Sequence, residues 1–381
     1  MNILLVNYEY KGQGGGAGQQ LYYMAKALRD MGHNITLLIG WDYRFGEPEL
    51  LENVTTHVIN CKRKNIQLAS AFGLLSFALR GVFRINQITR KSKFDIIQFY
   101  FCVPTGILKY GIHGNIPYVV SLRGMDIPGL QKNKYKALTF LTSMLNKDIA
   151  KNAAAVLSNS KESADVYNKF AANIHAKTIP NAIDFDSYRT KTEYAKTVSR
   201  IVSVGRLVSW KRMDLLIDSV VHLKKQFPEI ILDIYGQGYQ YENLQQHIIQ
   251  NNAQEYITLQ GYINKESLKN SMREYDLFAL LSTGDSSGNV FIEAMASGLP
   301  IFAAKAGGTT EIVEEDIIGI LSAPDNLNDT VQKLEHCLTH PEKMAELGAN
   351  GRKRVEEMFS LETAAQRHLD IYNGIITKKE R

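Results

Sequence analysis

Two carboxylates, Asp285 and Glu293, have the clearest chemical role in this chain, because they stand eight positions apart within one glycine-rich segment, 282–311. The segment follows a strand-like apolar run at 277–281 and passes through a Gly/Ser loop into a stretch with helical period. A second apolar run at 301–304 leads into another glycine loop and another helix start. The predicted order is strand, helix, strand, helix, with a glycine loop at the carboxyl end of each strand.

Loops at the carboxyl ends of parallel strands present backbone N–H groups and helix N-termini to an anion such as phosphate. A carboxylate repels phosphate. The suitable partners of Asp285 and Glu293 are therefore neutral hydroxyl pairs, such as a ribose diol or a sugar ring. A place for phosphate beside two hydroxyl-binding carboxylates predicts a site for a nucleotide sugar.

A strand, a glycine loop, a helix and a second strand also open the chain. The apolar run at 3–6 precedes the glycines of KGQGGGAGQQ, an amphipathic helix near 21–31 and a strand at 35–39. This order is typical of doubly wound α/β domains. Further strands are expected at 96–100, 118–122 and 155–159.

The same order returns from Ile201, and the strand-then-glycine pattern recurs in ILDIYGQG and YITLQGYI. The turn-rich stretch IPNAIDF, at 179–185, indicates a domain boundary. We therefore expect two Rossmann-like α/β/α domains facing a central cleft, 1–180 and 181–360. A last helix within 361–381 is expected to pack back onto the first domain.

The composition is that of an ordinary globular protein, with 45% hydrophobic and 22% charged residues. Three scattered cysteines without CxxC spacing indicate a reduced, cytoplasmic location. The N-terminus lacks a signal-peptide pattern, and the longest mostly apolar run, 68–79, is too short to span a bilayer. Residues 1–180 carry 22 Lys/Arg against 11 Asp/Glu, and residues 181–381 carry 22 against 28. This asymmetry predicts an anionic surface beside the first domain.

The segment 61–94 is rich in basic residues and has no acidic residue. A basic amphipathic helix of this kind is typical of proteins that bind an anionic membrane surface. The alternative is a helix packed on the core whose basic residues are its solvated face. The membrane interpretation places the protein on the inner face of the cell membrane, beside a lipid-linked acceptor. No nucleic-acid motif accompanies the segment, so nucleic acid is not expected as a partner. The basic residues are Lys62, Arg63, Lys64, Arg80, Arg84, Arg90, Lys91 and Lys93.

Four glycines between the first strand and the first helix allow a ligand to approach the backbone closely. A surface turn is the alternative interpretation of these glycines. A dinucleotide cofactor is a third, because Asp42 follows the second strand and could bind a ribose, although the glycine spacing is not GxGxxG. The glycines are Gly14, Gly15, Gly16 and Gly18.

Arg206 and Lys211 lie five residues apart at a strand-to-helix turn in GRLVSWKRMD. Their charges could neutralise a diphosphate leaving group. A lysine near a helix N-terminus opposes the helix macrodipole. That local disadvantage favours a functional role over an ordinary solvated helix start.

The stretches GRLVSWKRMDLLIDS, IYGQG, GNVFIEAMASGLPIFA and AGGTTEIV resemble family four of the retaining glycosyltransferases, which have the GT-B fold. The helix end MGHNITLL and the loop IPNAIDF also match the pattern of that family. The resemblance extends over essentially the whole chain and is more specific in the second domain than in the first.

The resemblance implies that Asp285 binds hydroxyls of the transferred sugar and that Glu293 binds the ribose of the nucleotide. Arg206 and Lys211 would hold the donor diphosphate, which Gly15–Gly16 would approach from the first domain. The other donor-side positions are Gly236, Gly288, Asn289 and Val290.

The chain departs from the family pattern at two positions. Asp285 stands where glutamate is usual, and a carboxylate one methylene shorter still accepts hydrogen bonds but changes the fit to the sugar. Arg123, in SLRGMD, stands where the family often has a histidine. Arginine cannot act as a general base at neutral pH, so we expect it to bind a phosphate or the acceptor, with Asp126 as its carboxylate partner.

We expect a metal-independent, retaining glycosyltransferase that needs no cofactor and uses a UDP- or GDP-sugar as donor substrate. The expected acceptor is a glycan or a lipid-linked molecule of cell-surface polysaccharide or glycolipid synthesis. Asp184 and Asp186 have DxD spacing, but they stand in the boundary turn and are interpreted as turn residues. An NAD(P)-dependent oxidoreductase and a non-catalytic subunit of a membrane glycan-assembly complex remain as alternatives. The expected catalytic residues are Arg123, Arg206, Lys211, Asp285 and Glu293.

Overall fold

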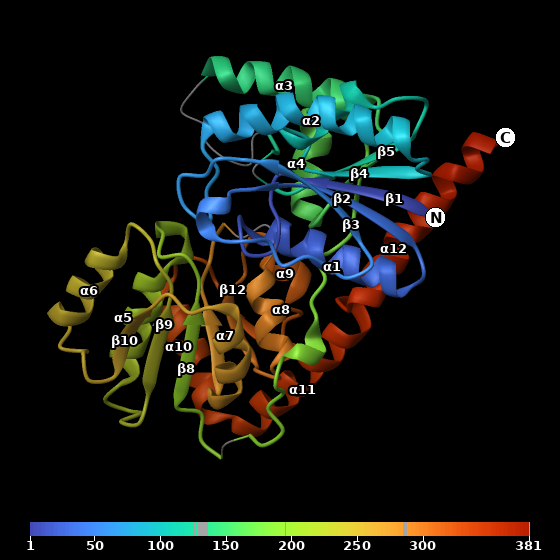
Figure 1. Ribbon diagram of the computed structural model, residues 1–381. Coiled ribbons are helices and arrows are strands. Elements are labelled where there is room, and N and C mark those ends of the chain that lie inside the picture. Colours follow the sequence, from blue (N-terminus) through green and yellow to red (C-terminus); the bar gives the residue numbers. More distant parts are fainter. Residues whose placement is uncertain (125, 129–135, 195, 285–287, 381) are drawn as a thin grey trace. The chain divides into compact units, whose positions relative to one another are not determined.

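The computed structural model of the chain describes residues 1–124, 126–128, 136–194, 196–284 and 288–380 (Figure 1). The chain forms two compact units. The first comprises residues 1–182 and 361–381, and the second comprises residues 183–360. The chain thus passes from the first unit to the second within the turn-rich stretch 179–185.

A parallel sheet of seven strands forms the centre of the first unit, in the order β3-β2-β1-β4-β5-β6-β7. Strands β4 and β5 are buried along their whole length, as expected for parallel strands that are covered on both faces. Leu5 of β1 lies opposite Leu37 of β2 and Gln98 of β4. The strands are β1 (Asn2–Asn7), β2 (Asn34–Trp41), β3 (Thr55–Asn60), β4 (Ile96–Tyr100), β5 (Tyr118–Leu122), β6 (Ala155–Ser158) and β7 (Ala176–Thr178).

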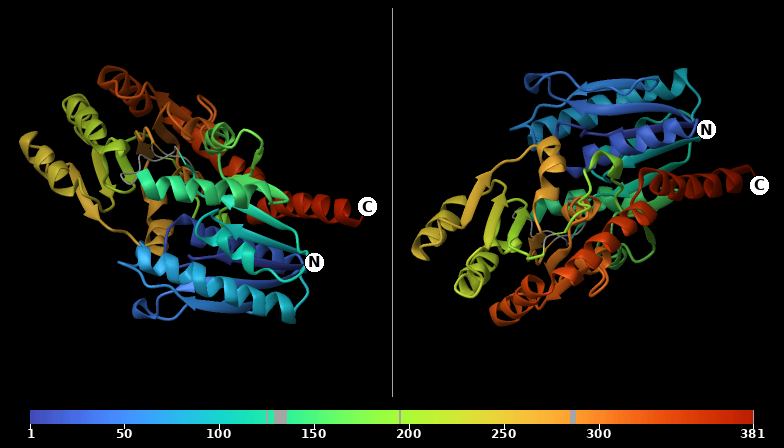
Figure 2. Two further views of the ribbon diagram at one scale, coloured as in Figure 1. Left: turned by 90° about the horizontal axis from the view of Figure 1, so that it is seen from above. Right: turned by 90° about the horizontal axis from the view of Figure 1, so that it is seen from below.

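Helices cover both faces of this sheet. In Figures 1 and 2, α2 and α3 lie over one face of the sheet, and α1 lies on the other, in contact with α12. A 3₁₀ segment, η2, packs against both α2 and α3. The segments are α1 (Gly16–Asp30), α2 (Ala71–Lys91), η2 (Thr105–Gly111), α3 (Lys136–Lys151), α4 (Lys161–Phe170) and α12 (Leu361–Glu380).

The second unit has a parallel sheet of six strands in the order β10-β9-β8-β11-β12-β13. The chain runs outward from β8 to β10 and then returns to the other side of β8 with β11. Neighbouring loops therefore diverge after β8 and β11, which makes a topological switch point. The strands are β8 (Arg200–Val204), β9 (Ile231–Tyr235), β10 (Ile257–Gly261), β11 (Leu277–Leu280), β12 (Ile301–Ala304) and β13 (Gly319–Ser322). The helices are α5 (Met213–Leu223), α6 (Tyr241–Gln250), α7 (Lys265–Ser271), α8 (Asn289–Ala296), α9 (Thr309–Ile312), α10 (Leu327–Thr339) and α11 (Pro341–Met358).

The predicted strands agree with the observed ones inside the sheets, and the strands that were missed lie at the edges. The observed ranges of β4, β5 and β12 match the predicted ranges residue for residue. Three strands were not predicted, namely β3, β7 and β13, and all three lie at the edge of a sheet. The residues of β3 and β7 are largely polar or partly exposed, and β13, with the sequence GILS, has only two adjacent large apolar residues. Such strands lack the continuous apolar run that marks a central strand.

The C-terminal helix α12 is anchored in the core of the first unit. The fully buried hydroxyl of Tyr372 donates to Oε1 of Gln98 on the central strand β4. One turn earlier, the ring of His368 is buried, and its Nδ1 lies 2.8 Å from the carbonyl oxygen of Ala364. Burial lowers the pKa of the His368 imidazole to about 4 from an ordinary value of 6.5. The helix therefore places an uncharged histidine inside the unit.

This buried histidine predicts a pH-dependent loss of stability. Below pH 6.5 the unfolded chain binds a proton at His368 that the folded unit does not bind until about pH 4. Stability is therefore lost as the pH falls through this range, by about 3 kcal/mol between pH 7 and pH 4. We expect His368→Leu to remove that part of the pH dependence, measured as the wild-type-minus-variant difference in urea unfolding free energy at the two pH values. The exposed His175, changed to Leu, is the matched control. A difference that does not vary with pH for His368→Leu would contradict the prediction.

Candidate active site

The carboxyl edge of the second sheet brings three loops together. The amide of Gly205, after β8, donates to the carbonyl oxygen of Tyr235 at 3.0 Å, which ties the loop to the end of β9. The amide of Thr283, after β11, donates to the carbonyl oxygen of Trp210 at 2.9 Å. The loops after β8, β9 and β11 are thus bonded to one another at the switch point, where ligands of doubly wound sheets bind.

Gly236 allows this close approach of two loops. Its φ is +157°, and a Cβ atom at this position would lie 1.8 Å from the carbonyl oxygen of Gly205. Any side chain would therefore collide with the backbone of the neighbouring loop. The predicted donor-side glycine has a clear structural role at the edge of the site.

The two predicted cations both lie on the loop between β8 and α5, in different environments. Arg206 is exposed, and its guanidinium lies 5.8 Å from the centre of the Trp210 ring. Lys211 is only 7% exposed, and its alkyl chain runs back beside Gly205. Transfer of a charged ammonium group out of water is costly unless an anion or strong acceptors compensate for it. Lys211 thus places a largely buried positive charge at the switch point of the second unit.

Glu293 lies on α8 and is 9% exposed. Its Oε1 lies 3.3 Å from Nζ of Lys265, the first residue of α7. The ion pair brings the predicted ribose-binding carboxylate to the loop that follows β10. Lys265 was not singled out in the sequence, because nothing in its local pattern indicates a partner 28 positions away.

The loop before α8 is described only in part. Asp285 lies outside the described residues, together with 286 and 287, so the predicted sugar-binding position stays a prediction from the sequence. Gly288 has a left-handed conformation, with φ +47° and ψ 31°, and Asn289 begins α8 directly after it. Val290, in the first turn, is half-buried and packs against the core of the unit.

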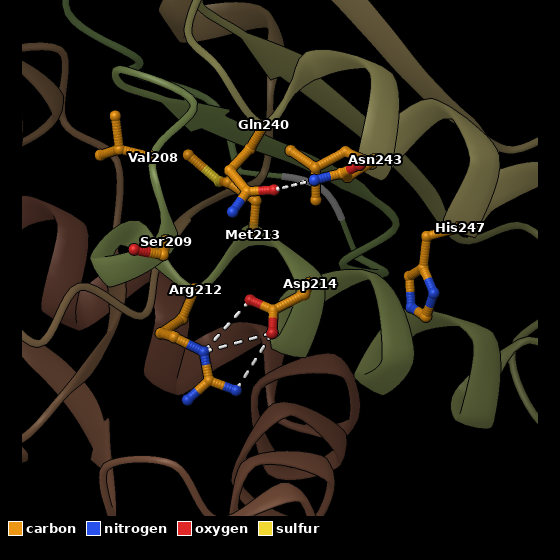
Figure 3. Close-up of a pocket in the computed structure, with 9 residues that line it drawn as sticks. Val208, Ser209, Arg212, Met213, Asp214, Gln240, Asn243 and His247 are labelled. Atoms are coloured by element: carbon orange, nitrogen blue, oxygen red, sulfur yellow. Dashed lines mark hydrogen bonds and ion pairs between the residues drawn. The ribbon is translucent and has the colours of Figure 1, made fainter.

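A cavity of about 380 Å³ lies between the start of α5 and α6 (Figure 3). Its cation, Arg212, is paired with Asp214 at 3.1 Å and also with Asp325. Gln240 and Asn243 are bonded to each other at 2.8 Å. Two other polar lining residues bond outside the wall, His247 to Asp218 at 2.6 Å and Ser209 to the Tyr239 hydroxyl at 3.0 Å. None of the predicted site residues lines this cavity.

In the first unit, a carboxylate of the protein itself occupies the N-terminus of α1. The amide of Gly15 donates to Oε2 of Glu9 at 2.9 Å, and Glu9 is buried. A Cβ atom on Gly14, whose φ is +108°, would lie 2.5 Å from Cδ of Glu9. Burial raises the pKa of Glu9, against the opposing effect of its bond to Gly15 and of the nearby charge of Arg63. Gly15 therefore belongs to an anion-binding turn that already holds an internal carboxylate, which the sequence analysis missed, and Gly16 begins α1 directly after it.

Arg63 and Asp42 complete a buried group of charges below this turn. Nη2 of Arg63 donates to the carbonyl oxygen of Tyr8 at 3.1 Å, and its Nε and Nη1 have no partner among the described residues. The Asp42 carboxylate accepts from the Arg63 amide at 2.7 Å and from Nη2 of Arg44 at 2.6 Å. These bonds hold the pKa of Asp42 well below its ordinary value. Asp42 is thus used inside the unit, whereas the dinucleotide alternative needed it to bind a ribose.

Arg123 and Asp126 meet at the carboxyl end of β5. The Asp126 carboxylate accepts from the Cys102 amide at 2.6 Å and from the Arg123 amide at 2.8 Å. Burial raises the pKa of Asp126 to about 6, although these bonds act against the rise. Nη1 of Arg123 donates to Oδ1 of Asn181 at 2.7 Å, and the guanidinium lies 4.6 Å from the centre of the Tyr100 ring. The structure brings the two residues together, and their acceptor-binding role stays a prediction.

Of the DxD-like pair, Asp186 lies in a short 3₁₀ segment, η3 (Phe185–Ser187), and Asp184 directly precedes that segment. Over the part of the chain that the structure describes, no group of three or more His, Cys, Asp or Glu side chains is placed to hold a metal ion.

Two family models match the chain, one in each half. Residues 14–187 match the model described as Glycosyltransferase Family 4, and residues 184–354 match the model described as Glycosyl transferases group 1. An uncharacterized glycosyltransferase of Methanocaldococcus jannaschii is 25% identical over 367 residues, which cover 95% of each chain.

Solved structures show the same fold. A sucrose-phosphate synthase from Thermosynechococcus elongatus superposes with a TM-score of 0.78 at 20% identity, over 99% of this chain and 100% of that one. An Anabaena protein in complex with UDP and glucose has a TM-score of 0.72 at 23% identity, over 97% and 98% of the two chains. The chain therefore belongs to the family-four glycosyltransferases, and its two parallel-sheet units have the GT-B fold.

Proposed function

We propose that this glycosyltransferase is a retaining enzyme that transfers a sugar from a nucleotide-diphosphate sugar without a metal ion. The observation that carries the proposal is the pair of cations, Arg206 and the buried Lys211, on the loop at the switch point of the second unit. Departure of a nucleoside diphosphate develops negative charge on phosphate oxygens. Fixed cations in a poorly hydrated site stabilise that charge without reorganisation.

Glu293 supplies the second part of the proposal. An ionised carboxylate is an acceptor with two oxygens, so it can accept from both hydroxyls of a ribose. Nζ of Lys265 lies 3.3 Å from Oε1 of the Glu293 carboxylate. The ion pair also fixes the side chain on its rotamer, so that less conformational entropy is lost when the nucleotide binds.

A UDP- or GDP-sugar is the proposed donor. The Anabaena relative of the same fold was solved with UDP and glucose, which supports a uridine nucleotide more directly than a guanosine one. The proposed acceptor is a glycan or a lipid-linked molecule of cell-surface polysaccharide or glycolipid synthesis. In this proposal the enzyme works in the cytoplasm, at the inner face of the cell membrane, and segment 61–94 contacts that membrane.

The choice of nucleotide can be tested by thermal unfolding. A ligand at 100 times its Kd stabilises the folded state by about 2.7 kcal/mol, so a UDP- or GDP-sugar should raise Tm measurably. NAD+, NADH, NADP+ and NADPH should leave Tm unchanged, because the Asp42 carboxylate is engaged inside the first unit. A Tm increase with the nicotinamide nucleotides alone would contradict the proposal and support the oxidoreductase.

The role of Glu293 can be tested by a conservative substitution. Glu293→Gln replaces a charged acceptor by a neutral amide. The substitution also removes the ion pair with Lys265. We expect kcat/KM for sugar transfer to fall roughly 10- to 1,000-fold, as for loss of one or two charge-assisted hydrogen bonds. Glu266→Gln, at an exposed glutamate beside Lys265, is the matched control and should retain wild-type transfer. Equal rates for both variants would show that Glu293 does not bind the donor, and absence of transfer by the wild type would favour a non-catalytic subunit.

Asp285 should influence the choice of sugar. Restoring the glutamate that is usual in the family lengthens the side chain by one methylene, which moves the carboxylate relative to the sugar hydroxyls. We expect Asp285→Glu to change the ratio of kcat/KM values for two epimeric nucleotide sugars by roughly tenfold or more. Competition between UDP-glucose and UDP-galactose measures that ratio. An unchanged ratio would remove Asp285 from the sugar-binding position.

A further inference from the structure

Helix α2 has two apolar faces, and only one of them is used by the core. Phe77, Ile85 and Ile88 are buried on the inner face. Gly81 lies so close to η2 that a Cβ atom there would be 2.7 Å from Cδ2 of Leu108. The inner face thus packs tightly on its own unit, which accounts for the helix without its second apolar face.

The second face carries an exposed line of large apolar side chains. Phe72 is 65% exposed, Leu75 59%, Leu79 59% and Phe83 73%. Their spacing of three, four and four residues places them along one side of the helix over three turns. We call these four residues the outer stripe. Single exposed apolar residues are common on protein surfaces, but a continuous line of four on one helix indicates a binding surface.

Exposed basic residues surround the outer stripe. Among the basic residues of segment 61–94, Arg63 is buried, so it does not belong to the surface that the sequence predicted. The guanidinium groups of Arg84 and Arg90 bond neutral partners, at His57, Gln87 and Asn86, and so keep their net charge. The segment has no acidic residue. The exposed basic residues are Lys62, Lys64, Arg80, Arg84, Arg90, Lys91 and Lys93.

We propose that the outer stripe and these basic residues dock the first unit on an anionic lipid membrane. Apolar side chains of an amphipathic helix enter the boundary between headgroups and acyl chains, while Lys and Arg bind the lipid phosphates. The described helices include none with the length and apolarity needed to cross a bilayer. The biological role of this docking rests on the proposed function, because docking brings the first unit to lipid-linked acceptors.

A second copy of the chain fits this surface less well. A twofold interface sets the same surface patch of each copy against the other. The basic residues of α2 would then face their own counterparts, and like charges that are brought together in an interface destabilise it. An anionic membrane provides the opposite charge and an apolar interior together.

The test is co-sedimentation of the intact chain with vesicles of phosphatidylcholine alone and of phosphatidylcholine with phosphatidylglycerol. We expect binding to the anionic vesicles that weakens as salt rises, and little binding to the neutral ones. The combined change Leu75→Gln, Leu79→Gln and Phe83→Gln should lower the partition coefficient roughly tenfold or more. Arg80→Gln with Arg84→Gln should have a similar effect.

The matched control changes two exposed apolar residues of the second unit, Ile249→Gln and Tyr262→Gln. It should bind as the wild type does. All the substituted residues are exposed, so circular dichroism and Tm should remain unchanged. The proposal is overturned if the wild-type protein does not bind anionic vesicles, or if both α2 variants bind them as strongly as the wild type does. The proposal is also overturned if analytical ultracentrifugation shows that the wild type is a dimer and that the triple change converts it to a monomer.

Vesicle binding is read without donor or acceptor, so its result is separate from that of the proposed function. Glu293→Gln should bind vesicles as the wild type does while losing transfer. Vesicle binding by an enzyme that transfers no sugar would defeat the proposed function and leave the docking surface intact. Transfer to a water-soluble acceptor without vesicle binding would defeat the docking surface and leave the proposed function intact.

Discussion

The carboxyl edge of a parallel sheet is the constraint on which both units depend. Parallel strands need a crossover between them, so every loop that leaves a strand end must gather at the same edge. The backbone N–H and C=O groups of these loops are not hydrogen-bonded within the sheet. The second unit ties three such loops together through the amides of Gly205 and Thr283, and close approach at Gly236 permits it. Arg206 is exposed on the loop after β8, together with Ser209 and Trp210, and places a positive charge at this edge.

The two units use charge at their loop edges in opposite ways. In the first unit, carboxylates face inward: Glu9 binds the amide of Gly15, and Asp126 binds the amides of Cys102 and Arg123. Each replaces water or a ligand as the acceptor for backbone donors, and each has a pKa raised by burial as the cost of that position. The first unit therefore holds its loops in place internally. In the second unit, by contrast, a buried lysine lies on the loop after β8, and an ion-paired glutamate lies on α8.

Much of the fold follows from short-range pattern, whereas the site follows only in part. Mostly apolar runs identified β4, β5 and β12, because a strand that is buried on both faces carries few polar residues, such as Gln98 in β4 and Ser121 in β5. Edge strands β3 and β7 carry polar residues and could not be found that way. Arg206 and Lys211 were recognisable because they share one loop. The partner of Glu293 was not, because Lys265 reaches it across the sheet from another helix.

The sequence by itself determined the strand–glycine–helix order of two α/β units and the residue types that suit a nucleotide sugar. Those signals are local, since glycine, charge and apolar period act within a few residues of one another. Only the tertiary structure decided that Glu9 fills the turn at Gly15 and that α2 presents a second apolar face. Both depend on packing between segments distant along the chain. A helix shows the same periodic pattern whether its outer residues are covered or exposed, and only the positions of its neighbours distinguish the two.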